Sequence, residues 1–85
     1  MFSVTWMEVA LNSLLEAMSS ADGERRELIE RSVIRLHALL EHDPYNFGES
    51  REGSRRVGFD GNCGITFWIE DSPDTVVRIT HFWTY

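Results

Sequence analysis

Three of the eight arginines lie close together in the connection between the helical and the strand-forming halves of the chain: Arg51, Arg55 and Arg56. This connection, residues 43–56, is also rich in glycine and serine. Connecting loops carry binding and catalytic residues more often than core elements do. The chain has no lysine, and the planar guanidinium of arginine makes bidentate contacts that an ammonium group cannot make. The pattern predicts a binding or active site in this connection.

The charge of the whole chain limits what such a site binds. The formal net charge is −6, which argues against broad attraction to nucleic acid or to anionic membranes. Two interpretations of the arginines therefore stay open. In the first they contact an anionic group on a partner. In the second they form weak, exposed ion pairs that only solubilise the loop, with Glu49, Glu52 and Asp60.

Other side chains that could do chemistry are scattered. His37 and His42 are about 140° apart around a helix, so they do not share a metal-binding face. Cys63 and His81 fall opposite each other in the expected sheet, which allows either a thiol–imidazole pair or an unreactive buried cysteine. The glycine spacing fits neither a P-loop nor a dinucleotide-binding turn. We expect no metal and no cofactor.

Length and cysteine content indicate the setting. The 85 residues are expected to form one small domain over residues 1–85. No apolar run approaches the roughly 20 residues that cross a bilayer, and the N-terminal residues lack the pattern of a signal peptide. The single cysteine forms no internal disulfide, which suits a reducing compartment. We expect a cytoplasmic protein without a membrane segment.

Helical periodicity is confined to the first half of the chain. A short strand over residues 2–5 leads into a helix that Thr5 and Glu8 would start as a capping box. The apolar stripe of this helix is Leu11, Leu14, Leu15 and Met18. Asp22 caps a second helix, which Pro44 stops. Its buried stripe is Ile29, Val33, Leu36 and Leu40. The two helices are expected to form an antiparallel hairpin.

Beyond the connection the hydrophobic period changes to two. Strands are expected over residues 55–59, 63–69 and 75–83, with a tight turn at Asp60-Gly61 and a loop over residues 70–74. The element order is strand, helix, helix and a meander of three strands. It predicts an α+β fold in which a helical hairpin packs on one face of a small antiparallel sheet.

Hairpin arithmetic assigns side chains to the two faces of that sheet. It pairs Phe59 with Asn62, Val57 with Gly64, Phe67 with Val77 and Ile65 with Ile79. The inner face collects Ile65, Phe67, Ile69, Val77 and Ile79. The outer face collects Arg55, Val57, Phe59, Thr66, Trp68, Val76, Arg78, Thr80 and Phe82. A register one residue off, or cover by the connection, is the alternative.

No other part of the chain obviously covers the outer face. Exposed apolar side chains flanked by arginine are typical of a partner surface. The predicted contact residues are Val57, Phe59, Trp68 and Phe82, together with the arginine-rich loop.

Five segments have a recognisable pattern in this order: Val4–Trp6, Leu39–Pro44, Gly48–Val57, Ile65–Ile69 and Val77–Trp83. Through them the chain resembles the RelE/ParE superfamily of toxins from bacterial type II toxin–antitoxin systems, which are also known for plasmid stabilisation. The resemblance extends over essentially the whole chain. It implies a compact toxin that is neutralised by an antitoxin segment wrapped over the sheet and the helices. Family members include ribosome-dependent mRNA endonucleases and gyrase inhibitors.

Cleavage of RNA by its own 2′-hydroxyl needs a base, cations for the phosphate and an acid for the leaving oxygen. The resemblance implies such roles for Arg55 and Arg78, with His81 or Tyr85 as acid or base. Arg56 completes the candidate catalytic set, and Arg51 joins Arg55 and Arg56 as candidate contacts to RNA or another target. The chain departs from the family pattern at Val57 and Gly64, where basic residues are expected. Whether it is an enzyme therefore stays open.

Three hypotheses follow from the resemblance. The chain is an endoribonuclease acting on mRNA at the ribosome, or a non-catalytic ParE-like inhibitor of a protein target such as DNA gyrase, or an inactive relative kept as an interaction module. A cognate antitoxin protein is the expected partner. Dimerisation through the open sheet face is a further alternative.

Overall fold

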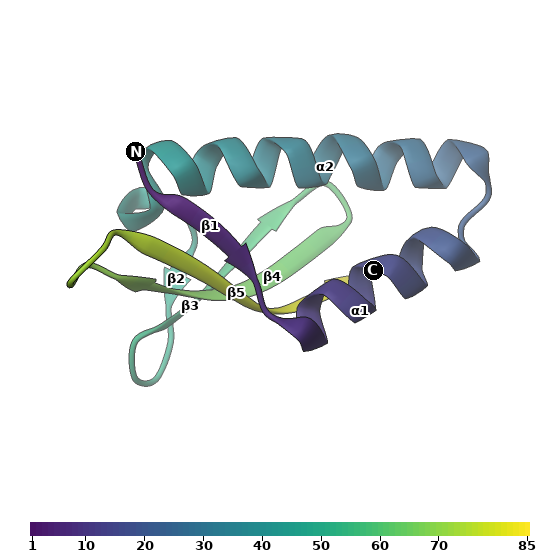
Figure 1. The fold of residues 1–85 in the computed structure, drawn as a ribbon. Helices are drawn as coiled ribbons and strands as arrows, with labels where there is room; N and C mark the ends of the chain where they lie inside the picture. The colour runs from purple at the N-terminus through teal and green to yellow at the C-terminus, as the bar shows by residue number, and fades with distance from the viewer.

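Two α-helices and a five-stranded sheet make up the computed structural model, which describes residues 1–85 (Figure 1). In chain order the elements are β1 (Ser3–Trp6), α1 (Glu8–Ser20), α2 (Gly23–His42), a 3-10 turn (Pro44–Asn46), β2 (Glu49–Ser50), β3 (Arg55–Asp60), β4 (Cys63–Glu70) and β5 (Val76–Thr84). The predicted α+β order of strand, two helices and three strands is confirmed. Strand β2 is an addition that forms within the connection.

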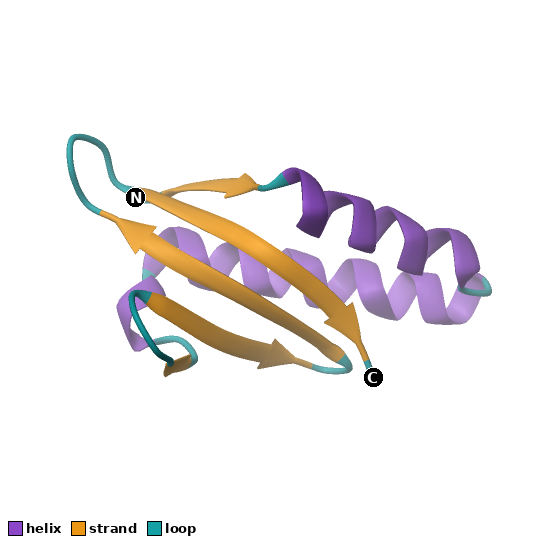
Figure 2. Cartoon of the chain, turned by 90° about the horizontal axis from the view of Figure 1, so that it is seen from below, coloured by secondary structure: helices purple, strands orange, loops and turns teal.

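The sheet is mixed, whereas the sequence predicted an antiparallel one. Its strand order is β1-β5-β4-β3-β2, and β1 runs parallel to β5 while all other neighbours are antiparallel. Parallel neighbours need a long crossover between them, and the chain from β1 to β5 includes both helices. Seen from below, the strands lie in front and α2 lies behind them (Figure 2). One face of the sheet is therefore covered by helix, and the other is open.

Local sequence signals predict both ends of α2 correctly, but they do not predict the start of α1. Asp22 caps α2 as predicted, with its Oδ1 accepting a hydrogen bond of 2.8 Å from the Arg25 backbone N–H. Helix α2 ends at His42, two residues before Pro44. The predicted capping box at Thr5 is wrong, because Thr5 lies in β1 and the chain stays extended until α1 begins at Glu8.

The turn between β3 and β4 differs from the prediction by one residue. Asp60 pairs with Cys63, so the two-residue loop is Gly61-Asn62 and not Asp60-Gly61. Gly61 has a φ of 58°, a left-handed conformation that glycine adopts without strain. As a result Val57 lies opposite Thr66 instead of Gly64. The shift is two residues along β4, so every side chain keeps its predicted face.

A β-bulge in the β4–β5 pair changes the faces near the C-terminus. Phe67 lies opposite Ile79, but the next residue back, Thr66, lies opposite His81. The extra residue on β5 reverses the alternation beyond it. Phe82 consequently faces the core with only 4% of its surface exposed, and its predicted place on the open face is wrong. The expected pairing of Cys63 with His81 is also wrong. The register of β4 against β5 differs from the prediction by two residues, since Phe67 lies opposite Ile79 instead of Val77, and the bulge adds one more, so Cys63 lies opposite Thr84.

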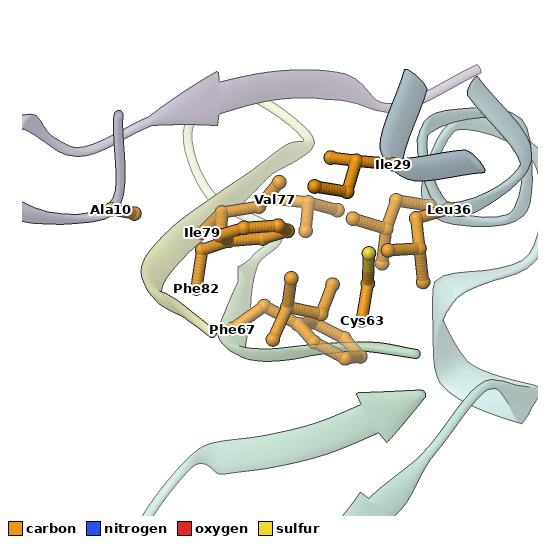
Figure 3. Close-up of a cluster of buried hydrophobic side chains, with 10 residues drawn as sticks. Ala10, Ile29, Leu36, Cys63, Phe67, Val77, Ile79 and Phe82 are labelled. Atoms are coloured by element: carbon orange, nitrogen blue, oxygen red, sulfur yellow. The ribbon is translucent and has the colours of Figure 1, made fainter. Parts of the chain in front are cut away.

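The core lies between the inner face of the sheet and α2 (Figure 3). Its fully buried side chains are Ala10, Ile29, Leu36, Leu40, Cys63, Ile65, Phe67, Val77, Ile79 and Phe82. The predicted inner face is confirmed, with Ile69 packed at its margin. The predicted stripe of α2 is also confirmed, although Val33 is only half-buried.

Helix α1 presents a different side to the core than its leucines predict. Ala10 is fully buried, whereas Leu11 and Leu15 are 41% and 55% exposed. The Met7 backbone N–H donates to the Ile79 carbonyl at 2.9 Å, which holds the start of α1 against β5. Small side chains on the inner side allow this close approach, and the larger ones are left outside. Neither helix combines the length and the apolarity that crossing a bilayer requires.

Candidate functional site on the open sheet face

Strand pairing brings together three of the predicted site residues on the open face. Trp68 lies between Arg55 on β3 and Arg78 on β5. The neighbouring row places His81 opposite Thr66. Residues paired across strands lie close enough for their side chains to interact. Arg55, Trp68 and His81 accordingly line one surface hollow of about 460 Å³, whose other walls are Glu52, Gly53, Ser54 and Thr80.

Arg55 is the free cation of this hollow. Its guanidinium forms none of the ion pairs of the structure, whereas Arg78 donates from Nε to Glu70 Oε2 at 2.9 Å. The charge of Arg78 is therefore partly neutralised. A free guanidinium beside the ring of Trp68 and the imidazole of His81 suits a phosphate or carboxylate that it can bind in bidentate fashion.

Arg56 points to the other side of the sheet from Arg55. Successive residues of a strand alternate in direction, and Arg56 lies opposite the core residue Phe67. Its guanidinium donates hydrogen bonds of 2.8–3.2 Å to the carbonyl oxygens of Tyr45, Phe47 and Gly48 and to the Ser50 hydroxyl. Arg56 therefore holds the connection in place and does not line the hollow.

Arg51 forms the kind of exposed ion pair that the sequence left open. Its Nη1 lies 3.0 Å from Glu49 Oε2, and both side chains are largely exposed. Asp60, another expected partner of the arginine cluster, instead pairs with Arg35 of α2 at 2.7 Å. The hydrogen bond that the Arg35 guanidinium donates to the Asp60 carboxylate raises the pKa of Arg35. Of the three arginines in the connection, only Arg55 has an unengaged guanidinium.

Tyr85 lies at the far end of the open face from the hollow. Its hydroxyl donates to the Gly61 carbonyl at 2.9 Å, which anchors the C-terminus to the β3–β4 turn. Its ring packs edge-on against Phe59, which packs in the same way against Trp83, with centroids 5.9 and 6.0 Å apart. Gly64 makes room for this cluster, because a Cβ there would lie 2.5 Å from the Trp83 ring. The predicted catalytic set is thus divided among three places: Arg55, Arg78 and His81 lie at or beside the hollow, Tyr85 lies at the β3–β4 turn, and Arg56 lies on the other side of the sheet.

The open face is uncovered, as its side chains show. Phe59 and Trp68 are 51% and 41% exposed, and Val57 is half-buried. Three of the four predicted contact residues therefore lie on this face, and Phe82 does not. Sequence reasoning missed Trp83, because the bulge that turns Phe82 inward also turns Trp83 outward. The Phe59–Gly64–Trp83 row shows this directly.

Comparison with known proteins finds similarity at the level of structure only. No family model matches the sequence, and no curated protein is similar to it in sequence. One similar structure is the toxin–antitoxin complex RelBE2 (Rv2865-2866) from Mycobacterium tuberculosis, with 18% identity, a TM-score of 0.76 and coverage of 99% of this chain and 98% of that one. Another is the chromosomal ParDE TA system from P. aeruginosa, with 13% identity, a TM-score of 0.74 and coverage of 99% and 96%.

This chain has a RelE/ParE-like fold. In each comparison the aligned region covers almost the full length of both chains, so the similarity extends over the whole fold and not one part of it. At these identities it concerns the fold and not the individual site residues.

The helical side of this RelE/ParE-like fold carries an apolar groove that sequence reasoning did not single out. It lies between α1 and α2, has a volume of about 320 Å³ and is lined by Leu14, Met18, Glu30, Val33 and Ile34. Ile34 is 68% exposed at its rim. The feature of the sequence that could have indicated this groove is the apolar stripe of α1, which is wider than the part of α1 that packs against β5.

Neither histidines nor the cysteine form a second chemical centre in this fold. No group of three or more histidine, cysteine, aspartate or glutamate side chains is arranged to hold a metal ion. Cys63 is fully buried, and this burial raises the pKa of its thiol. A protonated, inaccessible thiol is a poor nucleophile. His37 accepts a hydrogen bond of 3.1 Å from the Trp6 indole and is used within the fold.

Proposed function

We propose that this chain is the toxin of a type II toxin–antitoxin system and that it binds a cognate antitoxin. One observation carries the proposal: a RelE/ParE-like fold whose sheet leaves one face open, with half-exposed Phe59 and Trp68 and the free guanidinium of Arg55. Exposed apolar patches on small proteins mark surfaces that bind partners. The likeness to two toxin–antitoxin structures agrees with this use of the surface.

The antitoxin is proposed to cover two surfaces. On the open face it contacts Val57, Phe59 and Trp68, to which we add Trp83. On the helical side it fills the groove between α1 and α2, where Leu14, Met18 and Val33 offer an apolar floor. Aromatic residues and methionine are enriched in protein interfaces, and a few anchors, often tryptophans, supply most of the binding energy.

We favour a toxin that acts by binding a protein target, such as DNA gyrase, over one that cleaves RNA. RNA cleavage needs several cations together with an acid and a base. In the hollow Arg55 has no second free cation, because Arg78 is paired with Glu70 and Arg56 lies behind the sheet. Glu52 in the wall further weakens attraction for a polyanion.

The alternative is an mRNA endonuclease, and the observation that favours it is the joint position of Arg55 and His81 in one hollow. There Arg55 would bind the phosphate and His81 would act as acid or base, with Arg78 as a further phosphate contact. Tyr85 would have to give up its hydrogen bond to Gly61 to take part. An inactive relative that serves as an interaction module is the remaining alternative.

The experiment is growth of bacteria after induction of this chain alone, compared with Arg55→Ala and with Arg31→Ala as the matched control. Arg31 is an exposed arginine on α2 that pairs with Glu27 at 3.1 Å, away from the open face. The proposal predicts growth arrest with altered DNA supercoiling and intact mRNA, relieved by Arg55→Ala only. Arrest with mRNA cleavage would establish the endonuclease. Normal growth at good expression would reject the toxin assignment.

The antitoxin surface is tested by rescue. Fragments of the source genome are co-expressed to find one that restores growth, and Trp68→Glu is then introduced into the toxin. We expect Trp68→Glu to remain toxic and to escape rescue. If rescue is unchanged, the assignment of the open face is wrong.

We also propose that the protein works in the cytoplasm as one domain over residues 1–85. A concentration-dependent mass in solution that Trp68→Glu abolishes would instead reveal a dimer through the open face.

A further inference from the structure

Trp68 on the open face is flanked by two arginines, one free and one paired. Arg55 lies opposite it on β3, and Arg78 lies opposite it on β5. Neighbouring strands are about 4.8 Å apart, so each arginine begins one strand spacing from Trp68. Arg55 lines the hollow, whereas Arg78 is not among its lining residues.

The position of Glu70 explains why Arg78 is absent from the hollow. Glu70 lies two residues beyond Trp68 on β4, which makes it the diagonal neighbour of Arg78 on the same face. The Arg78 Nε donates to the Glu70 Oε2 at 2.9 Å, and the two side chains are 31% and 40% exposed. The hollow lies in the opposite direction along β5, at Thr80 and His81. The ion pair therefore draws the Arg78 guanidinium away from the hollow.

Two glutamates oppose the two arginines at this place. Glu52 in the wall of the hollow forms none of the ion pairs of the structure and faces Arg55 across it. Glu70 opposes Arg78 beside it. A ligand with one negative charge gains the planar donors of Arg55 and meets no excess of negative charge. A ligand with two or more charges is repelled by both glutamates and finds no second free cation.

The pair of Glu70 with Arg78 also indicates which group suits Arg55. Both arginines flank Trp68 from opposite strands, and Arg78 already holds a carboxylate. Arg55 has no carboxylate partner within its own chain. An acidic side chain of a protein partner would supply this group, while an apolar neighbour in the partner packs on Trp68, which is 41% exposed.

We propose that Glu70 determines which class of ligand the hollow accepts. By holding Arg78 aside, it leaves a site for one carboxylate of a protein partner and excludes multiply charged phosphates such as RNA. The inference deepens the proposed function and rests on its assignment of the open face to a protein partner. Glu70 acts through Arg78 and is therefore a positioning residue. Without Glu70, Arg78 would turn toward the hollow and join Arg55 as a second cation for phosphate.

The test compares two probes that share a phenyl ring: phenylacetate, with one negative charge, and phenyl phosphate, with two. Binding is followed at pH 7.5 and constant ionic strength through the indole resonance of Trp68, which Trp68→Phe assigns among the three tryptophans. In the unaltered chain phenylacetate should bind roughly threefold more tightly than phenyl phosphate. Arg55→Ala should abolish the effect of phenylacetate on Trp68.

Glu70→Gln should reverse this preference. It should tighten the binding of phenyl phosphate roughly 5- to 10-fold, the effect of one nearby charge on a dianion, and that of phenylacetate by less than about twofold. Glu70→Gln combined with Arg78→Ala should bind phenyl phosphate no better than the unaltered chain does. Glu27→Gln is the matched control, because it changes the net charge equally and frees Arg31 on α2, which pairs with Glu27 at 3.1 Å. Both affinities should be unchanged in this control.

Two results would overturn the proposal. Tighter binding of phenyl phosphate than of phenylacetate by the unaltered chain would favour the RNA-cleaving alternative. An unchanged preference in Glu70→Gln, or a gain that persists in the absence of Arg78, would remove the role of Glu70. The proposed function fails separately: the predicted preference without growth arrest would reject the toxin assignment alone, and growth arrest without the preference would reject the role of Glu70 alone.

Discussion

Replacement of Arg56 by lysine tests whether this arginine stabilises the connection, in contrast to the binding role proposed for Arg55. Arg56→Lys keeps the positive charge and most of the aliphatic stem but exchanges a planar fork of five N–H donors for one ammonium group. The Arg56 guanidinium reaches three carbonyl groups and one hydroxyl that are spread over residues 45–50. A point charge cannot reach all of them at once.

The structure allows the loss to be estimated. If two hydrogen bonds are lost at about 0.5–1.5 kcal/mol each, the free energy of unfolding falls by about 1–3 kcal/mol. Arg56 is half-buried, so water replaces part of the loss, and we take about 2 kcal/mol as the expected value. In a domain of this size 1 kcal/mol corresponds to about 4–8 °C in Tm. Arg56→Lys should therefore lower Tm by roughly 10 °C.

The assay is thermal unfolding followed by circular dichroism, with hydrogen exchange of the amides in residues 45–50. Arg55→Lys is the control, because the neighbouring guanidinium forms none of the ion pairs of the structure and its replacement should change stability by less than about 0.5 kcal/mol. Equal Tm values for the two variants would refute the structural role of Arg56. A lower Tm without faster exchange in residues 45–50 would refute the reasoning about the connection.

Three further predictions concern the sheet. Gly64→Ala should lower the free energy of unfolding by about 1–3 kcal/mol, because the added Cβ forces Trp83 off the strand. The measurement is urea unfolding, with Gly23→Ala as the control, because a Cβ at Gly23 meets nothing within 4 Å. Equal stability of the two variants would contradict the close approach of Gly64 and Trp83. Phe82→Ala should cost about 3–5 kcal/mol and Phe59→Ala far less, and the reverse order would show that the bulge is misplaced. Burial raises the pKa of the Cys63 thiol, so its contribution to stability is complete below the ordinary thiol value of about 8.5 and is lost as pH rises through the folded value. The free energy of unfolding should accordingly fall more steeply between pH 7.5 and pH 9.5 than in Cys63→Ala, and equal slopes would contradict the inference.

Local patterns were sufficient for the order of the elements and for most of the core. The cap at Asp22 and the stop before Pro44 bound α2 correctly, because both act within a few residues of themselves. The period of two identified the inner face through Ile65, Phe67 and Val77. The same period of two places Arg55 and Arg56 on opposite faces of the sheet, since consecutive strand residues point in opposite directions.

Pairing between distant strands decided the rest. The parallel contact of β1 with β5 kept Thr5 in a strand and overrode its capping signal. The bulge beside Thr66 sent Phe82 inward and brought Trp83 out, which redrew the candidate partner surface. Such features depend on hydrogen bonds and packing between segments far apart in the chain, and one added residue reverses every side chain beyond it. The sequence alone therefore determined which elements form and which strand face is apolar, while the tertiary structure decided which side chains meet on the open face.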